Sequence, residues 1–230
     1  MKADVSVIIP AAGLSLRMGT RVRKPFKVIG KKPIIFHTLE KFYKLRRIKE
    51  IILVVNKDDL STVIKKWSDK LKLYKVAAII NGGKRRQDSV FNGLRHLNSD
   101  TKIVLIHDAV RPLVNIKIIM AVIEKAEERG AAIVATPMKS TVKKVNSNLG
   151  IIETVPRHDL WMAQTPQGFK RDIIIGAYDK IKNTKTEFTD DAEVVEKCGF
   201  KVEIVSGSYD NIKITTREDL KLAESLLLEH

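Results

Sequence analysis

Short apolar runs alternate with longer amphipathic stretches along this chain of 230 residues. The apolar runs predict strands at residues 6–9, 50–55, 76–80, 103–107, 131–136 and 201–205. Apolar positions three and four residues apart predict helices at residues 34–46, 58–70, 86–97, 115–129, 170–182, 190–198 and 216–228. Because continuous Val and Ile runs are typical of strands covered on both faces, the alternation predicts an α/β fold with a doubly wound sheet.

One segment departs from this alternation. Two short β-like runs at residues 141–145 and 151–155 flank an Asn-Ser-Asn-Leu-Gly sequence, which predicts a hairpin turn. A hairpin inserted into a doubly wound sheet projects as an arm, here residues 138–158, and its apolar Ile151, Ile152 and Val155 need a partner to cover them. We therefore expect a second copy of the chain to pack against this arm.

Composition limits what the chain can be. Its hydrophobic content of 44% is enough for one substantial core, so we expect a single domain over residues 1–228. The lone Cys198 excludes an intrachain disulfide and a cysteine-clustered metal site, and it favours a reducing compartment. The first strand begins too early for a cleavable leader, and no apolar run is long enough to span a bilayer. These features predict a cytoplasmic protein without a membrane partner.

The formal charge of +15 has two explanations. An excess of Lys and Arg is typical of nucleic-acid binding, and equally of an enzyme whose ligands carry phosphate groups. Many basic residues lie in stretches of mixed charge, such as 41–50 and 121–129, where they form a solvated face. No helix-turn-helix, zinc finger or aromatic RNA-binding strand accompanies them. We expect no nucleic-acid partner, and a basic nucleotide- or RNA-binding protein without catalysis is the alternative.

The first predicted strand leads into residues 10–13, Pro-Ala-Ala-Gly, which are followed by Arg17 and Lys24. Small residues let the backbone approach a ligand closely, and the two cations add fixed positive charge. The pattern is neither the three-glycine dinucleotide fingerprint nor the Walker loop. An ordinary strand-to-helix turn has the same composition. Its position favours a phosphate-gripping loop, because open α/β sheets bind ligands at the carboxyl ends of their strands.

A glycine pair, Gly82 and Gly83, follows the third predicted strand and precedes a helix. Backbone amides there, with the Ser89 hydroxyl, can bind an anion or a base. A tight turn capped by Asp88 or Ser89 is the alternative.

Charged residues follow two later strands. Asp108 can hold Mg²⁺ or a ribose hydroxyl, and Arg111 can bind a phosphate with two hydrogen bonds. An ion pair between these two side chains is the alternative. Asp210 and Lys213 follow the last strand, so both can reach the same crevice.

In this order the motifs resemble those of the 2-C-methyl-D-erythritol 4-phosphate cytidylyltransferase family over residues 5–222. The matching positions are 10–18, 24, 82–83, 86, 89–90, 107–112, 141, 154–157, 161–169, 189–190 and 210–215. The resemblance implies a Rossmann-like mixed sheet of the nucleotide-diphospho-sugar transferase type. It also implies an enzyme of isoprenoid precursor synthesis that joins CTP and methylerythritol phosphate and releases pyrophosphate. A sibling family acting on ribitol 5-phosphate shares much of this framework and is the alternative, but Ser89-Val90 favours the methylerythritol enzyme.

The resemblance implies roles for individual residues. It gives four catalytic residues, Arg17, Lys24, Arg157 and Lys213. It gives a CTP-binding set of Pro10, Ala11, Ala12, Gly13, Gly83, Ser89 and Ala109. It gives a substrate-binding set of Asp108, Arg111, Thr141, Thr165 and Asp210. Mg²⁺ or another divalent cation would bind mainly through the CTP phosphates, near Asp108 and Asp210, and a homodimer clasped by the arm would bring arm residues of one subunit to the other's substrate.

The chain differs from the family pattern at Ser140, where Asp is usual, and at Pro25, where Gln is usual. Neither difference removes a charged catalytic group. The implied chemistry needs no general base, because a phosphate monoester has a second pKa of about 6 and is a dianion at neutral pH. We therefore expect His107 to be a packed residue at a strand end rather than a base.

Overall fold

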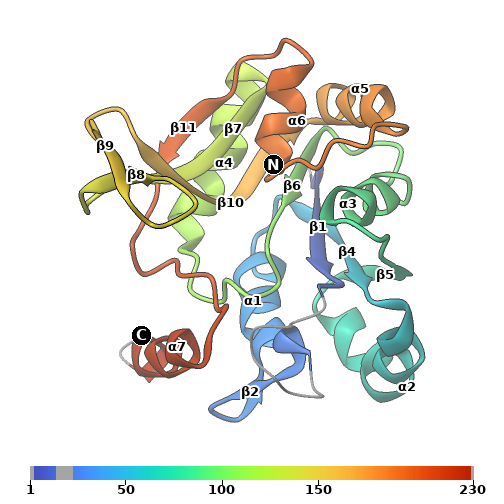
Figure 1. The fold of residues 1–230 in the computed structure, drawn as a ribbon. Helices are drawn as coiled ribbons and strands as arrows, with labels where there is room; N and C mark the ends of the chain where they lie inside the picture. Colours follow the sequence, from blue (N-terminus) through green and yellow to red (C-terminus); the bar gives the residue numbers. More distant parts are fainter. Residues whose placement is uncertain (1–2, 14–22, 229–230) are drawn as a thin grey trace.

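The computed structural model describes residues 3–13 and 23–228. They form a seven-stranded mixed sheet in the order β11-β7-β10-β6-β1-β4-β5 (Figure 1). Its strands are β1 (Val5–Ala11), β4 (Ile48–Val55), β5 (Val76–Asn81), β6 (Ile103–Ile106), β7 (Ala131–Pro137), β10 (Trp161–Lys170) and β11 (Glu203–Ser206). A short hairpin of β2 (Val28–Ile29) and β3 (Lys32–Pro33) lies beside it. The predicted doubly wound α/β fold with a mixed sheet is confirmed.

Seven α-helices in this part of the chain lie where the periodicity places them. They are α1 (Ile34–Tyr43), α2 (Lys57–Leu73), α3 (Arg86–Leu94), α4 (Ile116–Arg129), α5 (Arg171–Ile181), α6 (Asp191–Lys197) and α7 (Arg217–Leu228). Helices α1, α2 and α4 cover one face of the sheet, and α3, α5 and α6 cover the other. None of the helices in residues 3–13 and 23–228 is long and apolar enough to cross a membrane.

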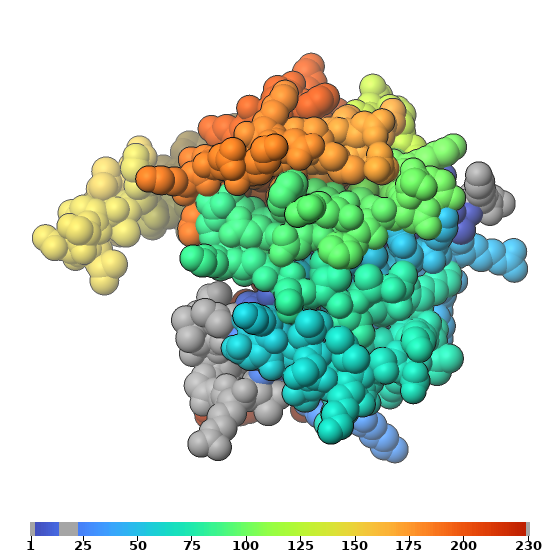
Figure 2. All heavy atoms as spheres, turned by 90° about the vertical axis from the view of Figure 1, so that its right-hand side faces the viewer, coloured from blue at the N-terminus to red at the C-terminus, as the bar shows by residue number. Residues whose placement is uncertain are grey.

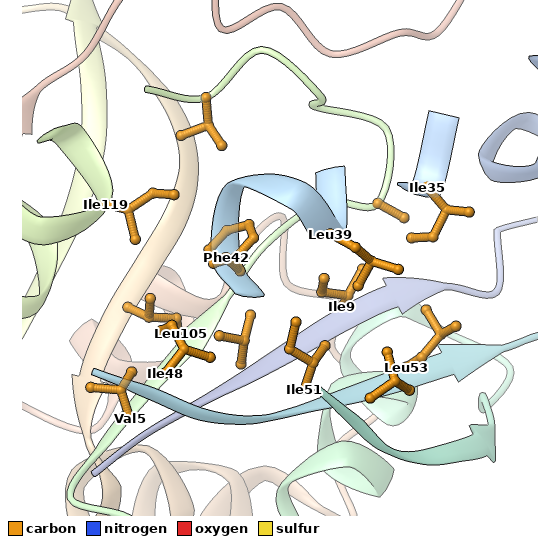
Figure 3. Close-up of a cluster of buried hydrophobic side chains, with 14 of the residues drawn as sticks. Val5, Ile9, Ile35, Leu39, Phe42, Ile48, Ile51, Leu53, Leu105 and Ile119 are labelled. Carbon is orange, nitrogen blue, oxygen red and sulfur yellow. The ribbon is translucent and has the colours of Figure 1, made fainter. Parts of the chain in front are cut away.

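The sheet separates two large clusters of buried side chains, because successive side chains of a strand point to its opposite faces. A third, smaller cluster includes Ile214 together with Ala223 of α7. On one face, Val5 and Ile9 of β1 pack with Leu39 of α1 and Ile119 of α4 (Figure 3). On the other face, Ile8 packs in a cluster with Val90 of α3. Strands buried on both sides need apolar residues at every position, which explains the unbroken Val and Ile runs.

Strand β10 was not predicted. It runs antiparallel between β6 and β7, and Gln167 pairs with Ile106 on one side and Ile133 on the other. Its sequence contains Pro166, which cannot donate to a strand ladder and is confined to edges and bulges. The pairing register shifts between Ala163 and Gln167, so the proline lies at such an irregularity. Because of its polar residues and its proline, this central strand lacks the apolar pattern from which the other strands were predicted.

The arm, residues 138–158, contains the predicted hairpin. Strands β8 (Val142–Val145) and β9 (Ile151–Val155) pair with each other and form a sheet separate from the main one. Figure 2 shows the arm, in yellow, standing out from the body of the molecule. Ile151 and Ile152 are 66% and 57% exposed, so the apolar face expected to meet a second copy is uncovered in one subunit.

The order in which the chain adds strands to the sheet reverses at β1, and this reversal positions the site. From β1 the chain continues outward through β4 and β5, and it then returns to β6 on the other side of β1. Crevices that bind ligands form at such switch points, outside the carboxyl ends of the strands. Strand β1 is longer than predicted, because Pro10 and Ala11 still pair with Val54 and Val55 of β4. The loop expected to begin at Pro10 therefore begins at Ala12.

Candidate active site

The carboxyl ends of β1, β4, β5 and β6 surround a pocket of about 780 Å³, here called the larger pocket. This volume lies within the usual range for small-molecule sites. All seven residues predicted to bind CTP line it, namely Pro10, Ala11, Ala12, Gly13, Gly83, Ser89 and Ala109. It is also lined by four charged residues, Lys24, Arg86, Asp108 and Lys213. The pocket wall therefore combines backbone that a ligand can approach closely with fixed charge.

The glycine pair brings the loops after β1 and β5 together. A Cβ on Gly82 would lie 2.5 Å from the Ala12 Cβ, and one on Gly83 would lie 2.3 Å from the Asp88 Cβ. The Gly83 amide donates to Ser89 Oγ at 3.0 Å, and the Arg85 amide donates to Asp88 Oδ2 at 3.0 Å. The turn is thus capped by Asp88 and Ser89, which was the alternative given in the sequence analysis. The same turn also forms part of the pocket wall.

A smaller pocket of about 180 Å³ adjoins the larger one. The two share Arg86, Asp108 and Lys213. The remaining lining residues of the smaller pocket are Arg111, Ala163, Gln164, Thr165, Gln167, Thr189 and Asp190. A ligand in each pocket would therefore meet the other beside the same three charged side chains.

Asp108 is the centre of this charged group. Its Oδ2 accepts from Lys213 Nζ at 3.0 Å and from Arg111 Nε at 3.2 Å, while Arg86 Nε lies 4.0 Å from Oδ1. Burial alone raises the pKa of the Asp108 carboxyl, but the three cations lower it well below its usual range. The carboxylate is ionised at neutral pH and holds the three cations in place, so the predicted Asp108–Arg111 ion pair is part of the site.

His107 is fully buried, as expected for a packed residue. The Asp108 amide donates to Thr165 Oγ1 at 3.1 Å, and Thr165 Oγ1 lies 3.0 Å from His107 Nδ1. His107 Nε2 lies 3.0 Å from the Arg111 carbonyl. The Thr165 hydroxyl therefore donates to Nδ1, and Nε2–H donates to the carbonyl, which assigns the neutral tautomer. Burial lowers the pKa of His107 to about 4, so it is neutral at physiological pH.

Lys24 reaches the larger pocket from a short 3-10 helix, η2 (Lys24–Phe26). Pro25 occupies the first turn of this helix, where proline is tolerated because no backbone donor is needed. Before it, Arg23 pairs with Asp58 of α2 at 3.2 Å and anchors the segment. The departure from the family pattern at Pro25 thus leaves Lys24 facing the pocket. Arg17 lies outside the described residues.

Three predicted residues do not line either pocket of their own subunit, as far as residues 3–13 and 23–228 show. Thr141 and Arg157 are exposed on the arm. Asp210 is exposed, and its Oδ2 accepts from Ser208 Oγ at 3.3 Å. The structure brings Lys24, Asp108, Arg111, Thr165 and Lys213 together, but not these three.

The described residues contain no group of three His, Cys, Asp or Glu side chains that could hold a metal ion. Asp108 is already surrounded by cations. A Mg²⁺ ion at this site would thus depend on phosphate oxygens of a ligand, as Mg²⁺ commonly does.

Sequence reasoning gave no role to several residues that the fold places at the pockets. Asn56 follows β4 directly and donates from Nδ2 to the Ala12 carbonyl at 3.3 Å. Gln167 accepts from the Asp191 and Ala192 amides, each at 3.0 Å. Arg86 belongs to a matched motif but received no function. Position after a strand was a signal for Asn56, and Gln167, like Arg86, lies in a matched motif whose function was not assigned.

A family model described as 2-C-methyl-D-erythritol 4-phosphate cytidylyltransferase, IspD, matches residues 5–229. The chain belongs to this family. The resemblance inferred from the motifs is thereby confirmed.

Relatives with the family's name cover nearly the whole chain. One from Alkaliphilus oremlandii is 45% identical over 225 residues, which is 98% of this chain and 95% of the relative. Another, from Bacillus cereus, is 44% identical over 222 residues, which is 96% of this chain and 97% of the relative.

Solved structures of family members have the same fold. The 4-diphosphocytidyl-2C-methyl-D-erythritol synthase of Anaerococcus prevotii has a TM-score of 0.84 at 34% identity, covering 97% of this chain and 96% of that one. The family member from Thermus thermophilus has a TM-score of 0.80 at 30% identity, covering 98% and 99%. The expected family fold is therefore present over the part of the chain that the structure describes.

Proposed function

We propose that this chain transfers a cytidylyl group from CTP to 2-C-methyl-D-erythritol 4-phosphate and releases pyrophosphate. The observation that carries the proposal is the pair of pockets that share Arg86, Asp108 and Lys213. The larger pocket accommodates the nucleotide and the smaller one the sugar phosphate. The two phosphate groups that react then meet between them.

The reaction is a displacement at the α-phosphorus of CTP. A phosphate oxygen of the sugar phosphate forms the new bond to that phosphorus, and the bond from phosphorus to the α,β-bridging oxygen breaks. Pyrophosphate leaves with those electrons, and no proton needs to be removed from the dianionic nucleophile. The obstacle is repulsion between two anions, so catalysis depends on positioning and on fixed positive charge.

The residues of the site supply these needs. Lys24, together with Arg17, neutralises the triphosphate and the crowded α-phosphoryl group. Lys213, held by Asp108 at 3.0 Å, bridges toward the incoming phosphate. Arg111 and Thr165 line the smaller pocket and orient the sugar phosphate.

The nucleotide base lies against the backbone of residues 11–12 and the glycine turn. Fixed amides and the Ser89 hydroxyl read its hydrogen-bonding edge. A divalent cation, Mg²⁺ in our proposal, binds through the triphosphate and supplies charge neutralisation there.

Thr141 and Arg157 complete the site from a second subunit. Both lie on the arm, away from the pockets of their own subunit, and the exposed Ile151 and Ile152 offer an apolar contact for a partner copy. We propose a homodimer in the cytoplasm, with neither nucleic acid nor membrane as a partner.

Pyrophosphate release tests the proposed function. We expect turnover with CTP, Mg²⁺ and methylerythritol phosphate, much weaker turnover with ribitol 5-phosphate, and a wide preference for CTP over UTP. Faster turnover with ribitol 5-phosphate would assign the chain to the sibling activity. Absence of release with either sugar phosphate, from a folded protein that binds CTP, would favour a non-catalytic nucleotide-binding protein.

A further inference from the structure

Arg86 lies where the two pockets meet. It is the first residue of α3, its side chain is 27% exposed, and it lines both pockets with Asp108 and Lys213. Its Nη2 donates to Asp191 Oδ2 at 2.7 Å, and its Nε lies 4.0 Å from Asp108 Oδ1. Within residues 3–13 and 23–228, Nη1 makes no hydrogen bond. A partly exposed guanidinium with donor capacity left unused therefore lies in the wall that both pockets share.

Asp191, which lines neither pocket, accepts a hydrogen bond from Arg86. It is the first residue of α6, and its side chain has no exposed surface. Besides Arg86, it accepts from the Tyr178 hydroxyl at 2.6 Å through Oδ1. The Tyr178 ring of α5 stacks on Phe91 of α3, with ring centroids 6.3 Å apart, so the hydroxyl has a fixed direction.

A buried carboxylate between an arginine and a tyrosine fixes the arginine's orientation. Burial lowers the pKa of the Arg86 guanidinium, but Asp191 and Asp108 together raise it above its ordinary value, and burial beside Asp191 raises the pKa of the Tyr178 hydroxyl. Arg86 is therefore permanently charged and Tyr178 is a permanent donor. Guanidinium groups held in one plane bind phosphate with two parallel hydrogen bonds.

We propose that Arg86 contacts the incoming sugar phosphate and that Asp191 and Tyr178 are the positioning residues that aim it. This inference rests on the proposed function. It adds a substrate-contacting cation to that site, and it gives a function to a buried group that lies behind the pocket wall.

A solely structural role makes a different prediction. If Arg86 only neutralises the buried Asp191, a variant that lacks both charges regains the stability and the activity of the parent. If Arg86 also binds substrate, the double variant regains stability but not activity. Arg86→Gln, Asp191→Asn, Tyr178→Phe and the double variant Arg86→Gln/Asp191→Asn separate the two roles.

We expect Arg86→Gln to raise KM for the sugar phosphate and lower kcat/KM by roughly 10- to 100-fold, the range that corresponds to a lost charge-assisted hydrogen bond. KM for CTP should stay within about twofold, since that pocket keeps its other contacts. Asp191→Asn and Tyr178→Phe should shift the same KM in the same direction by smaller factors. The double variant should recover melting temperature while its kcat/KM stays at the level of Arg86→Gln.

Asp4 and Arg47 provide a matched control. They form an ion pair at 2.8 Å, both are under a tenth exposed, and Asp4 lies before β1 at the opposite end of the sheet. Asp4→Asn should lower the melting temperature and leave both KM values unchanged.

The inference is overturned if the double variant regains the activity of the parent, or if folded Arg86→Gln keeps the parent's KM for the sugar phosphate. An inactive parent protein would instead overturn the proposed function, and this inference with it. Because parent turnover is measured first, the two failures are distinguishable.

Discussion

Several side chains of the site are held by His107 and Asn211, which line neither pocket. The Thr165 hydroxyl accepts from the Asp108 amide and donates to His107 Nδ1. Arg111 donates from Nη1 to the Asn211 carbonyl at 2.7 Å. Asn211 in turn donates to the Thr165 carbonyl at 2.9 Å. The charged groups are therefore held in place before a ligand arrives, which is what electrostatic catalysis requires.

His107 gives a prediction at this scale. The unfolded chain binds a proton at this side chain below a pH of about 6.5, but the folded protein does not until about pH 4. Between these values the unfolded state holds more protons, so His107 makes the free energy of unfolding fall as the pH falls. Its contribution is up to about 3 kcal/mol and is fully present above pH 6.5.

Urea denaturation between pH 7 and pH 4.5 measures this contribution. The variant His107→Gln should be less stable than the parent at pH 7, and its stability should depend less steeply on pH. Equal pH dependence in both proteins would contradict the assignment of a buried neutral histidine.

At the scale of elements, the crevice is made by close contact between loops that follow different strands. Gly82 allows the loops after β1 and β5 to touch, since a Cβ there would lie 2.5 Å from Ala12 Cβ and 2.8 Å from Ser89 Oγ. The glycine turn therefore sets the width of the larger pocket between these two loops.

Gly82→Ala should push these loops apart and weaken CTP binding by roughly 5- to 150-fold, because overpacking of this kind costs about 1–3 kcal/mol. Titration calorimetry with CTP measures the effect. Gly176→Ala is the control, since a Cβ at this position in α5 meets nothing within 4 Å. A folded Gly82→Ala protein with unchanged CTP affinity would show that the turn does not shape the site.

The sequence allowed the parallel part of this architecture to be predicted. Strands β1, β4 and β6 contain runs of buried Val, Ile and Leu because both of their faces are covered, and the clusters that follow them line the larger pocket. Strand β10 escaped prediction because Pro166 and the polar side chains of Gln164 and Gln167 oppose a strand pattern. Those glutamines are buried for tertiary reasons, since Gln164 donates to the Ser208 carbonyl and Gln167 binds the start of α6.

The same limit applies to the site. Lys24, Asp108 and Lys213 could be found from strand-end position and motif, but their mutual distances could not. The Tyr178–Asp191–Arg86 contacts join α5 and α6 to α3, which lies about a hundred residues earlier in the sequence. No periodicity or local motif encodes a contact of that kind.

At the scale of the whole molecule, the arm decides whether one subunit is a complete enzyme. Arg157 lies on the arm, while Lys24 lines the larger pocket. If each arm crosses to its partner, every active site combines Lys24 of one subunit with Arg157 of the other.

Subunit mixing tests this arrangement. Lys24→Ala and Arg157→Ala should each be nearly inactive. Unfolding and refolding an equal mixture makes about half of the dimers mixed, and each mixed dimer has one site with both lesions and one with neither. Activity should therefore recover to roughly a quarter of the parent level. No recovery, with mixed dimers verified by native mass spectrometry, would place Arg157 in its own subunit's site.

The fate of oxygen atoms tests the central claim most directly, that the sugar phosphate itself attacks the α-phosphorus of CTP. The parent protein is given CTP, Mg²⁺ and methylerythritol phosphate whose terminal phosphate oxygens carry ¹⁸O, and both products are weighed by mass spectrometry. The account predicts that the cytidylyl product retains every labelled oxygen, one of them in the new bridge, and that pyrophosphate carries none. Labelled pyrophosphate, or a product that has lost label, would contradict it.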